Sequence, residues 1–253
     1  FAFASAFNQP LSLDTCSVRN MLGTFGGASA FNQPLSLDTA SVMDMSLMFS
    51  SSAFNQPLTL NTSSVSTMRS MFSYASAFNQ PLSLDASSVT SMGLMFSHAS
   101  AFNQPLTLRT SSVTEMGGMF EAASAFNQPL TLDTSSVTDM GEMFRYASAF
   151  NQPLSFNTSS VTYMGGMFAF ASAFNQPLSF DTSSVTDMSA MFEVRSRAPL
   201  HTCYLNPQPS QTAPHHTRRA RRFRAASAAA ALYTRPSTRV PERPQLHRLP
   251  PEP

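Results

Sequence analysis

The pentapeptide FNQPL recurs eight times in this 253-residue chain, and its spacing constrains the fold more than any other feature. The copies begin at Phe7, Phe31, Phe54, Phe78, Phe102, Phe126, Phe150 and Phe174. Their period is 24 residues, except for one interval of 23 between Phe31 and Phe54. A fixed period of this length is typical of stacked units that cannot bury their apolar side chains alone. The sequence therefore predicts a solenoid of about eight coils over residues 1–194.

The repeat that starts at Phe126 reads FNQPLTLDTSSVTDMGEMFRYASA and contains two apolar patterns. Leu130 and Leu132 alternate with polar residues, which predicts a short strand, and Pro129 fits its start because proline lacks an N–H donor. The DTSS sequence that follows favours a bend. Beyond it, apolar residues spaced i, i+3, i+4 and i+7 predict a short helix or 3₁₀ turn. They are Met140, Met143, Phe144 and Ala147.

Stacking such coils should place the same residue at the same height in every coil. At the ~4.8 Å strand spacing, eight parallel coils would form a rod or shallow arc roughly 40 Å long. Its core would consist of columns of Phe, Leu and Met, and most of the sixteen Met residues fit there as filler rather than as metal ligands. We expect Met140 and Phe144 to be buried in the middle of the stack.

The repeat pattern FNQ-x-L … D-T-S-S-V-T-x-M-x-x-M-F-x-x-A resembles that of the BspA-like leucine-rich-repeat surface proteins. In particular it resembles the Mycoplasma-type repeat of unknown function found in bacterial lipoproteins and in some marine algae. The resemblance covers Phe1 to about Val194 and implies a leucine-rich-repeat-like solenoid on a cell surface, active in adhesion or protein interaction. Repeats of that family usually carry Trp before Asp-Thr, whereas this chain has no Trp and places Leu or Phe there. Because this Trp is absent, any activity of the family that depends on it is not expected in this chain.

Residues 195–253 form a tail that differs from the repeats in composition and charge. Residues 1–194 contain four Arg against twelve Asp and Glu, a net charge of −8, whereas the tail contains eleven Arg against two Glu, a net charge of +9. Rich in Pro and Ala and without sustained apolar periodicity, the tail should be disordered. Its Arg cluster at 218–224 could bind nucleic acid or acidic surfaces. We do not expect the repeats themselves to bind nucleic acid. The alternative is that the tail translates DNA not normally read in this frame.

Three polar columns have both a functional and a structural interpretation. The Asn of FNQPL could form a binding stripe, but its identity in all eight copies favours a ladder in which side-chain amides satisfy backbone groups. The Asp that begins DTSS could bind calcium, but Arg109 occupies the same column, which favours an Asx turn. Where this column holds Asn61 and Asn157, N-x-Ser/Thr sequons arise, which are candidate glycosylation sites in a secreted protein. The regular Ser/Thr runs could bind ice or a glycan, or could cap turns.

Enzyme templates do not fit the chain. No residue suited to acid–base or nucleophilic chemistry stands in a special setting, and no His is placed to activate one of the many Ser. No phosphate-binding loop and no cluster with metal-ligand spacing is present, so neither a cofactor nor a metal is expected. No apolar stretch is long enough to span a membrane. The sequence predicts a protein without catalytic activity.

Function is best sought in the columns that vary between otherwise identical repeats, because the fold should not dictate those residues. Stacking should bring them onto one edge, where exposed Tyr and Arg favour protein partners. They include Arg69, Tyr74, His98, Glu121, Glu142, Arg145, Tyr146, Tyr163 and Phe170. We therefore predict a non-enzymatic module that binds a protein or glycan partner at a cell surface. One alternative is that the residues of this edge vary by neutral drift and have no function. The other is a structural, ice- or glycan-binding solenoid that uses the Ser/Thr face.

The ends of the repeat array lead to a separate expectation. The chain opens with FAFASAF, which matches Phe168–Phe174, so we expect the natural N-terminus and any signal region to lie upstream. Terminal coils without caps expose core columns and strand edges. We expect the isolated chain to aggregate or associate end to end, with residues 198–253 disordered. Light scattering with limited proteolysis tests this, and a monodisperse monomer with a protease-resistant tail would contradict it.

Overall fold

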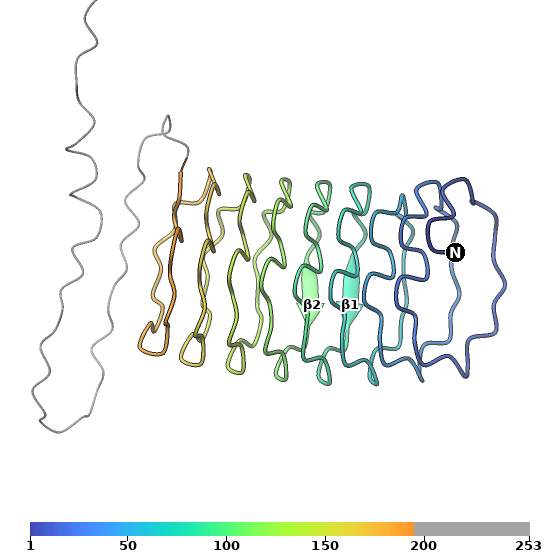
Figure 1. Cartoon of the computed structure of the whole chain (residues 1–253), viewed down its shortest axis with the longest axis horizontal. Coiled ribbons are helices and arrows are strands. Elements are labelled where there is room, and N and C mark those ends of the chain that lie inside the picture. Colours follow the sequence, from blue (N-terminus) through green and yellow to red (C-terminus); the bar gives the residue numbers. More distant parts are fainter. Residues whose placement is uncertain (195–253) are drawn as a thin grey trace, which may run out of the picture. The chain divides into compact units, whose positions relative to one another are not determined.

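A computed structural model describes residues 1–194 of the chain, and these residues form a row of stacked coils (Figure 1). We number each coil by the FNQPL copy that begins it, so coil 4 is 78–101, coil 5 is 102–125 and coil 6 is 126–149. The predicted repeat architecture is confirmed. Residues 195–253, for which disorder is predicted, lie outside the described residues.

Two strands lie side by side in the middle of the stack. Strand β1, Leu82–Leu84, pairs in parallel with β2, Leu106–Leu108, with Ser83 opposite Thr107. The leucines are buried and the central residue of each strand is exposed, as the alternating pattern predicts. In the other coils within residues 1–194 this segment forms no regular strand pair. The strand prediction is therefore confirmed for coils 4 and 5 only.

A second line of parallel contacts crosses the whole stack just before the Met-rich segment of each coil. Single bridges connect successive members of one column, which are Asn20, Asp44, Thr67, Ser91, Glu115, Asp139, Tyr163 and Asp187. Every step moves to the next coil, so the register is constant from one end of residues 7–194 to the other. This constant register places equivalent residues of neighbouring coils side by side, and the columns expected from the sequence are formed.

The predicted helical turn is wrong, because the structure contains no helix within residues 1–194. In coil 6, the N–H groups of Met143, Arg145 and Ala147 close turns onto the carbonyl three residues back. The N–H groups between them donate instead to the next coil, as Phe144 does to the Met167 carbonyl at 2.9 Å. Glu142 has a positive φ of 57°, which a right-handed helix does not allow. Successive backbone N–H groups therefore donate in turn to a carbonyl of the same coil and to a carbonyl of the next coil.

The apolar stripe of this segment is nevertheless assigned correctly. Met140, Met143, Phe144 and Ala147 are all fully buried. Their spacing specifies which side chains point inward, but it does not specify where the backbone N–H groups donate. In a stack, the neighbouring coil offers a carbonyl to every second residue, so the chain needs no helix to satisfy its donors.

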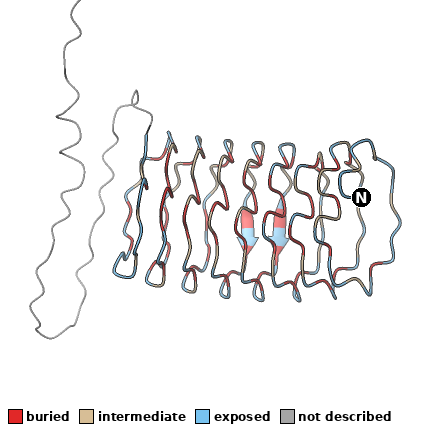
Figure 2. Cartoon of the chain, in the orientation of Figure 1, coloured by how far each residue is buried: buried red, intermediate tan, exposed pale blue. Residues whose placement is uncertain are grey.

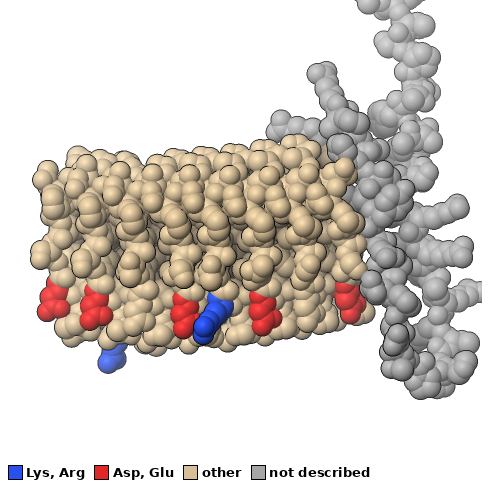
Figure 3. All heavy atoms as spheres, turned by 180° about the vertical axis from the view of Figure 1, so that it is seen from behind, with Lys and Arg blue, Asp and Glu red and all other residues tan. Residues whose placement is uncertain are grey.

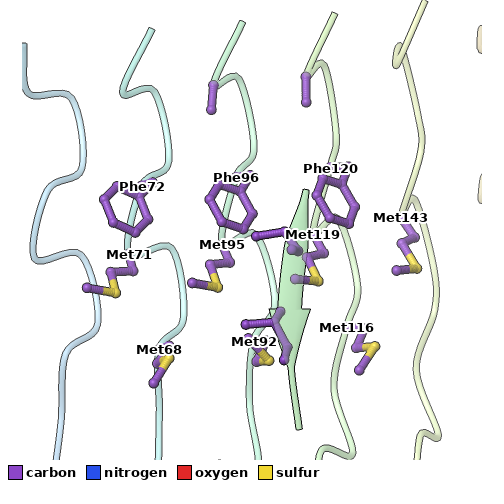
Figure 4. Packing of buried hydrophobic residues seen from close by; sticks show 14 of the residues in the cluster. Met68, Met71, Phe72, Met92, Met95, Phe96, Met116, Met119, Phe120 and Met143 are labelled. Atoms are coloured by element: carbon purple, nitrogen blue, oxygen red, sulfur yellow. The ribbon is translucent and has the colours of Figure 1, made fainter. Parts of the chain in front are cut away.

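Columns of Phe and Met fill the core (Figure 4). The Phe of FNQPL and the Phe of the Met-Phe pair form two adjacent columns of stacked rings, and in coils 2–7 they contain twelve rings that are fully buried or nearly so. Phe144 lies 4.1 Å from Phe150 and 5.7 Å from Phe120, measured between ring centroids. Figure 2 shows that buried stretches recur from coil to coil, with exposed residues at the bends. The predicted burial of Met140 and Phe144 is confirmed.

Candidate functional site

The asparagine column acts as the predicted ladder. The Oδ1 atom of Asn127 accepts a hydrogen bond from the backbone N–H of Asn151 at 2.9 Å and from Nε2 of Gln152 at 3.1 Å. The same bond between consecutive Asn residues is present at every step from Asn8 to Asn175. These side-chain oxygens are therefore occupied within the protein, and the ladder prediction is confirmed.

A buried threonine column performs a similar task inside the coil. The Thr134 hydroxyl donates to the Asn157 carbonyl of the next coil at 2.9 Å, and Thr110 and Thr158 make the equivalent bond. Ala86 occupies this column in coil 4 and is fully buried. Because alanine has no hydroxyl, the equivalent bond to the Arg109 carbonyl cannot form there.

Ala86→Thr is expected to stabilise the protein. It introduces the hydroxyl that the column carries in neighbouring coils, and a hydrogen bond of this kind contributes about 0.5–1.5 kcal/mol. A urea titration should show a higher unfolding midpoint with an unchanged slope. Ala86→Val, which has similar bulk without the hydroxyl, is the control. Equal midpoints for the Thr and Val variants would show that the hydroxyl forms no such bond.

One row of acidic side chains lies along an edge of the face seen in Figure 3, interrupted by a basic residue. The row corresponds to the first residue of DTSS, whose side chain forms the predicted Asx turn. Asp133 Oδ1 accepts bonds from the Ser135 N–H at 3.0 Å and from its hydroxyl at 2.7 Å. These two donors, the hydroxyl first, hold the pKa of Asp133 below its ordinary value. The pKa of Asp85 is lowered by Ser87 in the same way, with a smaller contribution from Arg109.

The solenoid should lose stability in acid. An aspartate whose pKa is lower in the folded chain contributes stability that is full above its unfolded pKa and disappears as pH falls through the folded value. Asp133 and Asp85 behave this way, so the thermal midpoint should fall between about pH 5 and about pH 2. Asp133→Asn keeps the turn, as Asn157 does, and should reduce the acid sensitivity. A midpoint that is constant over this pH range would contradict the assignment.

The two candidate glycosylation sites lie in this same row. Asn61 and Asn157 are exposed, and each side-chain oxygen accepts a 2.8 Å bond from the hydroxyl of the serine two positions on. The regular Ser/Thr runs are engaged as well. Thr138 donates to the Thr114 carbonyl at 3.1 Å, and Ser136 donates to the Ser111 carbonyl at 2.8 Å. The structural interpretation of these runs, in which hydroxyls satisfy backbone groups, is thereby supported.

Seven of the nine residues proposed as a binding edge lie in one continuous cluster. We call it the edge cluster, and it consists of Tyr74, His98, Glu121, Glu142, Arg145, Tyr146 and Phe170. Ring pairs form its two ends, with centroids 4.2 Å apart for Tyr74 and His98 and 4.7 Å apart for Tyr146 and Phe170. Tyr74 is the most exposed of these rings, with 55% of its surface accessible.

Charged groups connect the two ring pairs. The Arg145 guanidinium lies 3.2 Å from Glu142 and 3.6 Å from Glu121, and it sits over the Tyr146 ring at 5.0 Å. The other carboxylate oxygen of Glu121 is 3.4 Å from the Ser97 hydroxyl, which contacts Nδ1 of His98 at 2.9 Å. The variable columns therefore meet as a contiguous mixed surface of rings and charges.

Arg69 and Tyr163, the other two proposed edge residues, lie outside this cluster. Arg69 forms an ion pair with Glu115, two coils away, and the pair passes over Gly93 of the coil between them. The Tyr163 ring covers Gly141 and Gly165, where an added methyl group would overlap it. Sequence reasoning missed Glu115 and Gly93. The available signal was the glycine of coil 4, which lies between an Arg of coil 3 and a Glu of coil 5 whose columns are two positions apart.

The assumption that the fold does not dictate the variable columns needs correction. Tyr74, His98, Tyr146 and Phe170 all have φ near +60°, and so do Leu94 and Glu142. This left-handed conformation is required by the turns that connect each coil to the stack, and it costs a non-glycine residue about 1–2 kcal/mol. The fold therefore fixes the backbone conformation at these positions, but it does not fix which side chain occupies them.

Neither a metal centre nor a membrane-spanning helix emerges from the described part of the chain. Within residues 1–194, no three His, Cys, Asp or Glu side chains gather closely enough to hold a metal ion. The same residues contain no helix that is long and apolar enough to cross a membrane. A shallow hollow of about 550 Å³ lies on the strand face and is lined by Thr59, Ser83 and Thr107 among others.

These features define a parallel solenoid of turn-rich coils, held by polar ladders and bearing an irregular outer edge. Three overlapping segments of the chain, residues 1–83, 58–132 and 130–199, match the family described as "Mycoplasma protein of unknown function, DUF285". The chain belongs to this family. A comparison with curated proteins found no match, and no solved structure matches either.

Proposed function

We propose that the solenoid is a non-enzymatic interaction or adhesion module that binds a protein or glycan partner, carried by a BspA-like leucine-rich-repeat protein at a cell surface. The edge cluster is the observation that supports this proposal. Its residues are the ones that differ among nearly identical coils, and they combine accessible Tyr rings with a partly exposed Arg, the side chains that most often anchor interfaces. We expect no catalytic activity, although the sequence expectation that no His lies near a Ser was wrong, since the Ser97 hydroxyl lies 2.9 Å from Nδ1 of His98.

The alternative role, an ice- or glycan-binding solenoid that uses the regular Ser/Thr runs, has less support. The hydroxyls of Thr138 and Ser136 already donate to backbone carbonyls, which reduces their capacity for a ligand. The exposed Thr59, Ser83 and Thr107 around the shallow hollow would be the better contact points for a glycan. A glycan would therefore contact the strand face, and a protein partner would contact the edge cluster.

A random peptide library displayed on phage separates these roles when it is selected against the full chain. The edge variant combines Tyr74→Ser, Arg145→Ser and Tyr146→Ala, each of which introduces a residue that occurs in the same column of another coil. The face variant, Ser136→Ala with Thr138→Ala, is the control. Selected peptides should bind the edge variant at least about tenfold more weakly, since two or three anchor residues are lost, and should bind the face variant like the natural chain. Failure to enrich peptides, or equal binding to the edge variant, would contradict the proposal.

A further inference from the structure

The residue that follows FNQPL in each coil is Ser or Thr, and its hydroxyl is not used by the fold. In coils 4 and 5 these residues are Ser83 and Thr107, the exposed central residues of β1 and β2 (Figure 1). From coil 1 to coil 7, all within the described residues, these side chains are exposed and form no hydrogen bond with the protein. We call them the hydroxyl row, and they are Ser12, Ser36, Thr59, Ser83, Thr107, Thr131 and Ser155.

The other hydroxyls of a coil have structural partners. In coil 6, every Ser or Thr hydroxyl except that of Thr131 donates to an oxygen atom of the protein. The donors are Thr134, Ser135, Ser136, Thr138 and Ser148. An exposed strand position would accept any polar side chain, yet this column varies only between Ser and Thr and keeps the hydroxyl in all eight coils. The fold therefore does not explain the hydroxyl row.

The hydroxyl row crosses the shallow hollow of about 550 Å³ on coils 3 to 5, a volume within the ~300–1,000 Å³ typical of ligand sites. Thr59, Ser83, Thr107 and Gln104 form its polar lining. Because Nε2 of Gln104 donates to Asn79 Oδ1 at 3.2 Å, its Oε1 is left as an acceptor. Three leucines and two prolines complete the lining. The hollow thus places apolar surface beside hydroxyl and amide groups.

The chemistry of the hollow favours an uncharged ligand that is rich in hydroxyls. None of its nine lining residues is charged. Protein hydroxyls both donate and accept, as sugar hydroxyls do, and Leu and Pro side chains suit the C–H face of a sugar ring. The exposed Asp85 and Asp133 lie two residues beyond the hydroxyl row, and residues 1–194 carry a net charge of −8. An acidic glycan would therefore be repelled.

The spacing of the hydroxyl row indicates an extended chain of sugars. Parallel strands place successive hydroxyls ~4.8 Å apart. The register, with Ser83 opposite Thr107, keeps the hydroxyls in line. A β-1,4-linked chain of hexoses is extended and advances by nearly this length per sugar, whereas an α-1,4-linked chain curves away from a straight row. Each sugar of a β-1,4-linked chain can therefore meet one coil.

We propose that the strand face binds an uncharged β-1,4-linked polysaccharide that runs along the stack, with the hollow as its main contact. Thr59, Ser83 and Thr107 bond to hydroxyls of successive sugars, and Gln104 Oε1 accepts one further bond. This inference rests on the proposed interaction function and names the class of glycan for this face. An ice surface fits less well, because the hollow interrupts the face and because Ser replaces Thr in several coils.

The test titrates the full chain with cellohexaose, an uncharged β-1,4-linked glucose oligomer, and follows the backbone amide signals of Thr59, Ser83 and Thr107 by NMR. Saturable shifts are expected at millimolar cellohexaose. Cellobiose should bind at least about fivefold more weakly, since it reaches fewer coils. Maltohexaose, which has the same sugar in an α-1,4-linked chain, and acidic hexagalacturonate should give no saturable shifts.

The hydroxyl variant combines Thr59→Val, Ser83→Ala and Thr107→Val, which remove three hydroxyls and nearly keep the shape of the side chains. It should bind cellohexaose at least about tenfold more weakly, because three hydrogen bonds are lost. The face variant, Ser136→Ala with Thr138→Ala, removes hydroxyls that already donate to backbone carbonyls, so it should bind like the natural chain. Unchanged binding in the hydroxyl variant, equal shifts with maltohexaose, or no saturable shift with cellohexaose would overturn the inference.

Ser83→Arg provides a second variant in case the hydroxyl variant fails to fold. Its long side chain would cover the hollow from an exposed position and should abolish the shifts. If cellohexaose fails to bind while selected peptides still require the edge cluster, only this inference is lost. If no peptide needs the edge cluster but cellohexaose binds in the hollow, the role of the edge cluster fails and the glycan site stands. Ice shaping that depends on the hydroxyl row, without glycan binding, would overturn the inference.

Discussion

Phe144→Ala is expected to lower the free energy of unfolding by about 3–5 kcal/mol, the usual cost of deleting a fully buried ring. Phe144 is inaccessible to solvent, and its ring contacts those of Phe120, Phe150 and Phe168 in both Phe columns. Because the core of each coil packs against its two neighbours, a cavity in coil 6 weakens the interfaces on both sides of it. A urea titration followed by circular dichroism measures the loss.

Phe170→Ala is the matched control for this prediction. Phe170 is partly exposed and belongs to the edge cluster, so its removal should cost less than about 1.5 kcal/mol, the value of one aromatic pair. A loss below about 1 kcal/mol for Phe144→Ala would mean that this column faces solvent rather than the core.

Asn127→Ala is expected to cost about 1–3 kcal/mol, because it leaves the partly buried N–H of Asn151 without an acceptor. The Asn151 N–H and the Gln152 amide both donate to Asn127 Oδ1. The Gln152 amide also donates to the Asn127 backbone carbonyl at 3.2 Å, which the substitution keeps, so the Asn151 N–H is the donor that loses its acceptor. The neighbouring Asn103 and Asn151 side chains accept from other coils. The change should also speed amide exchange at Asn151, which hydrogen-exchange NMR can detect.

Asn127→Asp separates the hydrogen bond from the shape of the side chain. A carboxylate keeps the acceptor oxygen, so this variant should stay within about 0.5 kcal/mol of the natural chain at neutral pH. If the Ala and Asp variants were equally stable, the ladder would contribute little beyond packing. If Asn151 exchanged at the natural rate in Asn127→Ala, the proposed acceptor would be wrong.

Much of this fold could be predicted from the period alone. A 24-residue repeat fixes the number of coils, and identical residues at identical heights imply the Phe and Met columns that the structure contains. The Asn ladder followed from the same reasoning, since an invariant polar residue in a stack needs partners inside the stack. The Asx turns followed from the turn-forming residues of DTSS. In the Phe, Met and Asn columns, one residue type that recurs from coil to coil carried enough information.

The Met-rich segment could not be predicted in the same way. Its spacing of i, i+3, i+4 and i+7 is shared by a helix and by consecutive turns whose alternate donors reach the next coil. The choice depends on residues with a left-handed backbone, such as Glu142 and Tyr146, which are not themselves glycine. Gly118 and Gly166, with φ of 62° and 63°, occupy the column of Glu142 and were the available signal. A glycine recurring in one column of a repeat indicates a positive φ for the whole column.

The edge cluster was also only partly predictable. Variation between coils identified Tyr74, Arg145 and Tyr146, but the contacts between columns depend on which way each long side chain leans. Arg145 leans back toward Glu121, whereas Glu142 leans forward over Gly166. Arg69 leans over Gly93 of the next coil, and the Tyr163 ring covers Gly141 of the preceding coil and Gly165 of its own coil. Side-chain direction at an exposed edge is not encoded in the repeat period.

A disulfide between neighbouring coils tests the stacked register most directly. Ser83 and Thr107 are register partners on β1 and β2, and both are exposed. In a chain with Cys16→Ser and Cys203→Ser, the pair Ser83→Cys and Thr107→Cys should oxidise readily within one molecule, because paired strands bring Cα atoms within the ~4.4–6.8 Å that a disulfide spans. Ser83→Cys with Thr131→Cys, two coils apart at about 10 Å, should not. Absence of the first disulfide, or formation of both at equal rates, would contradict the solenoid.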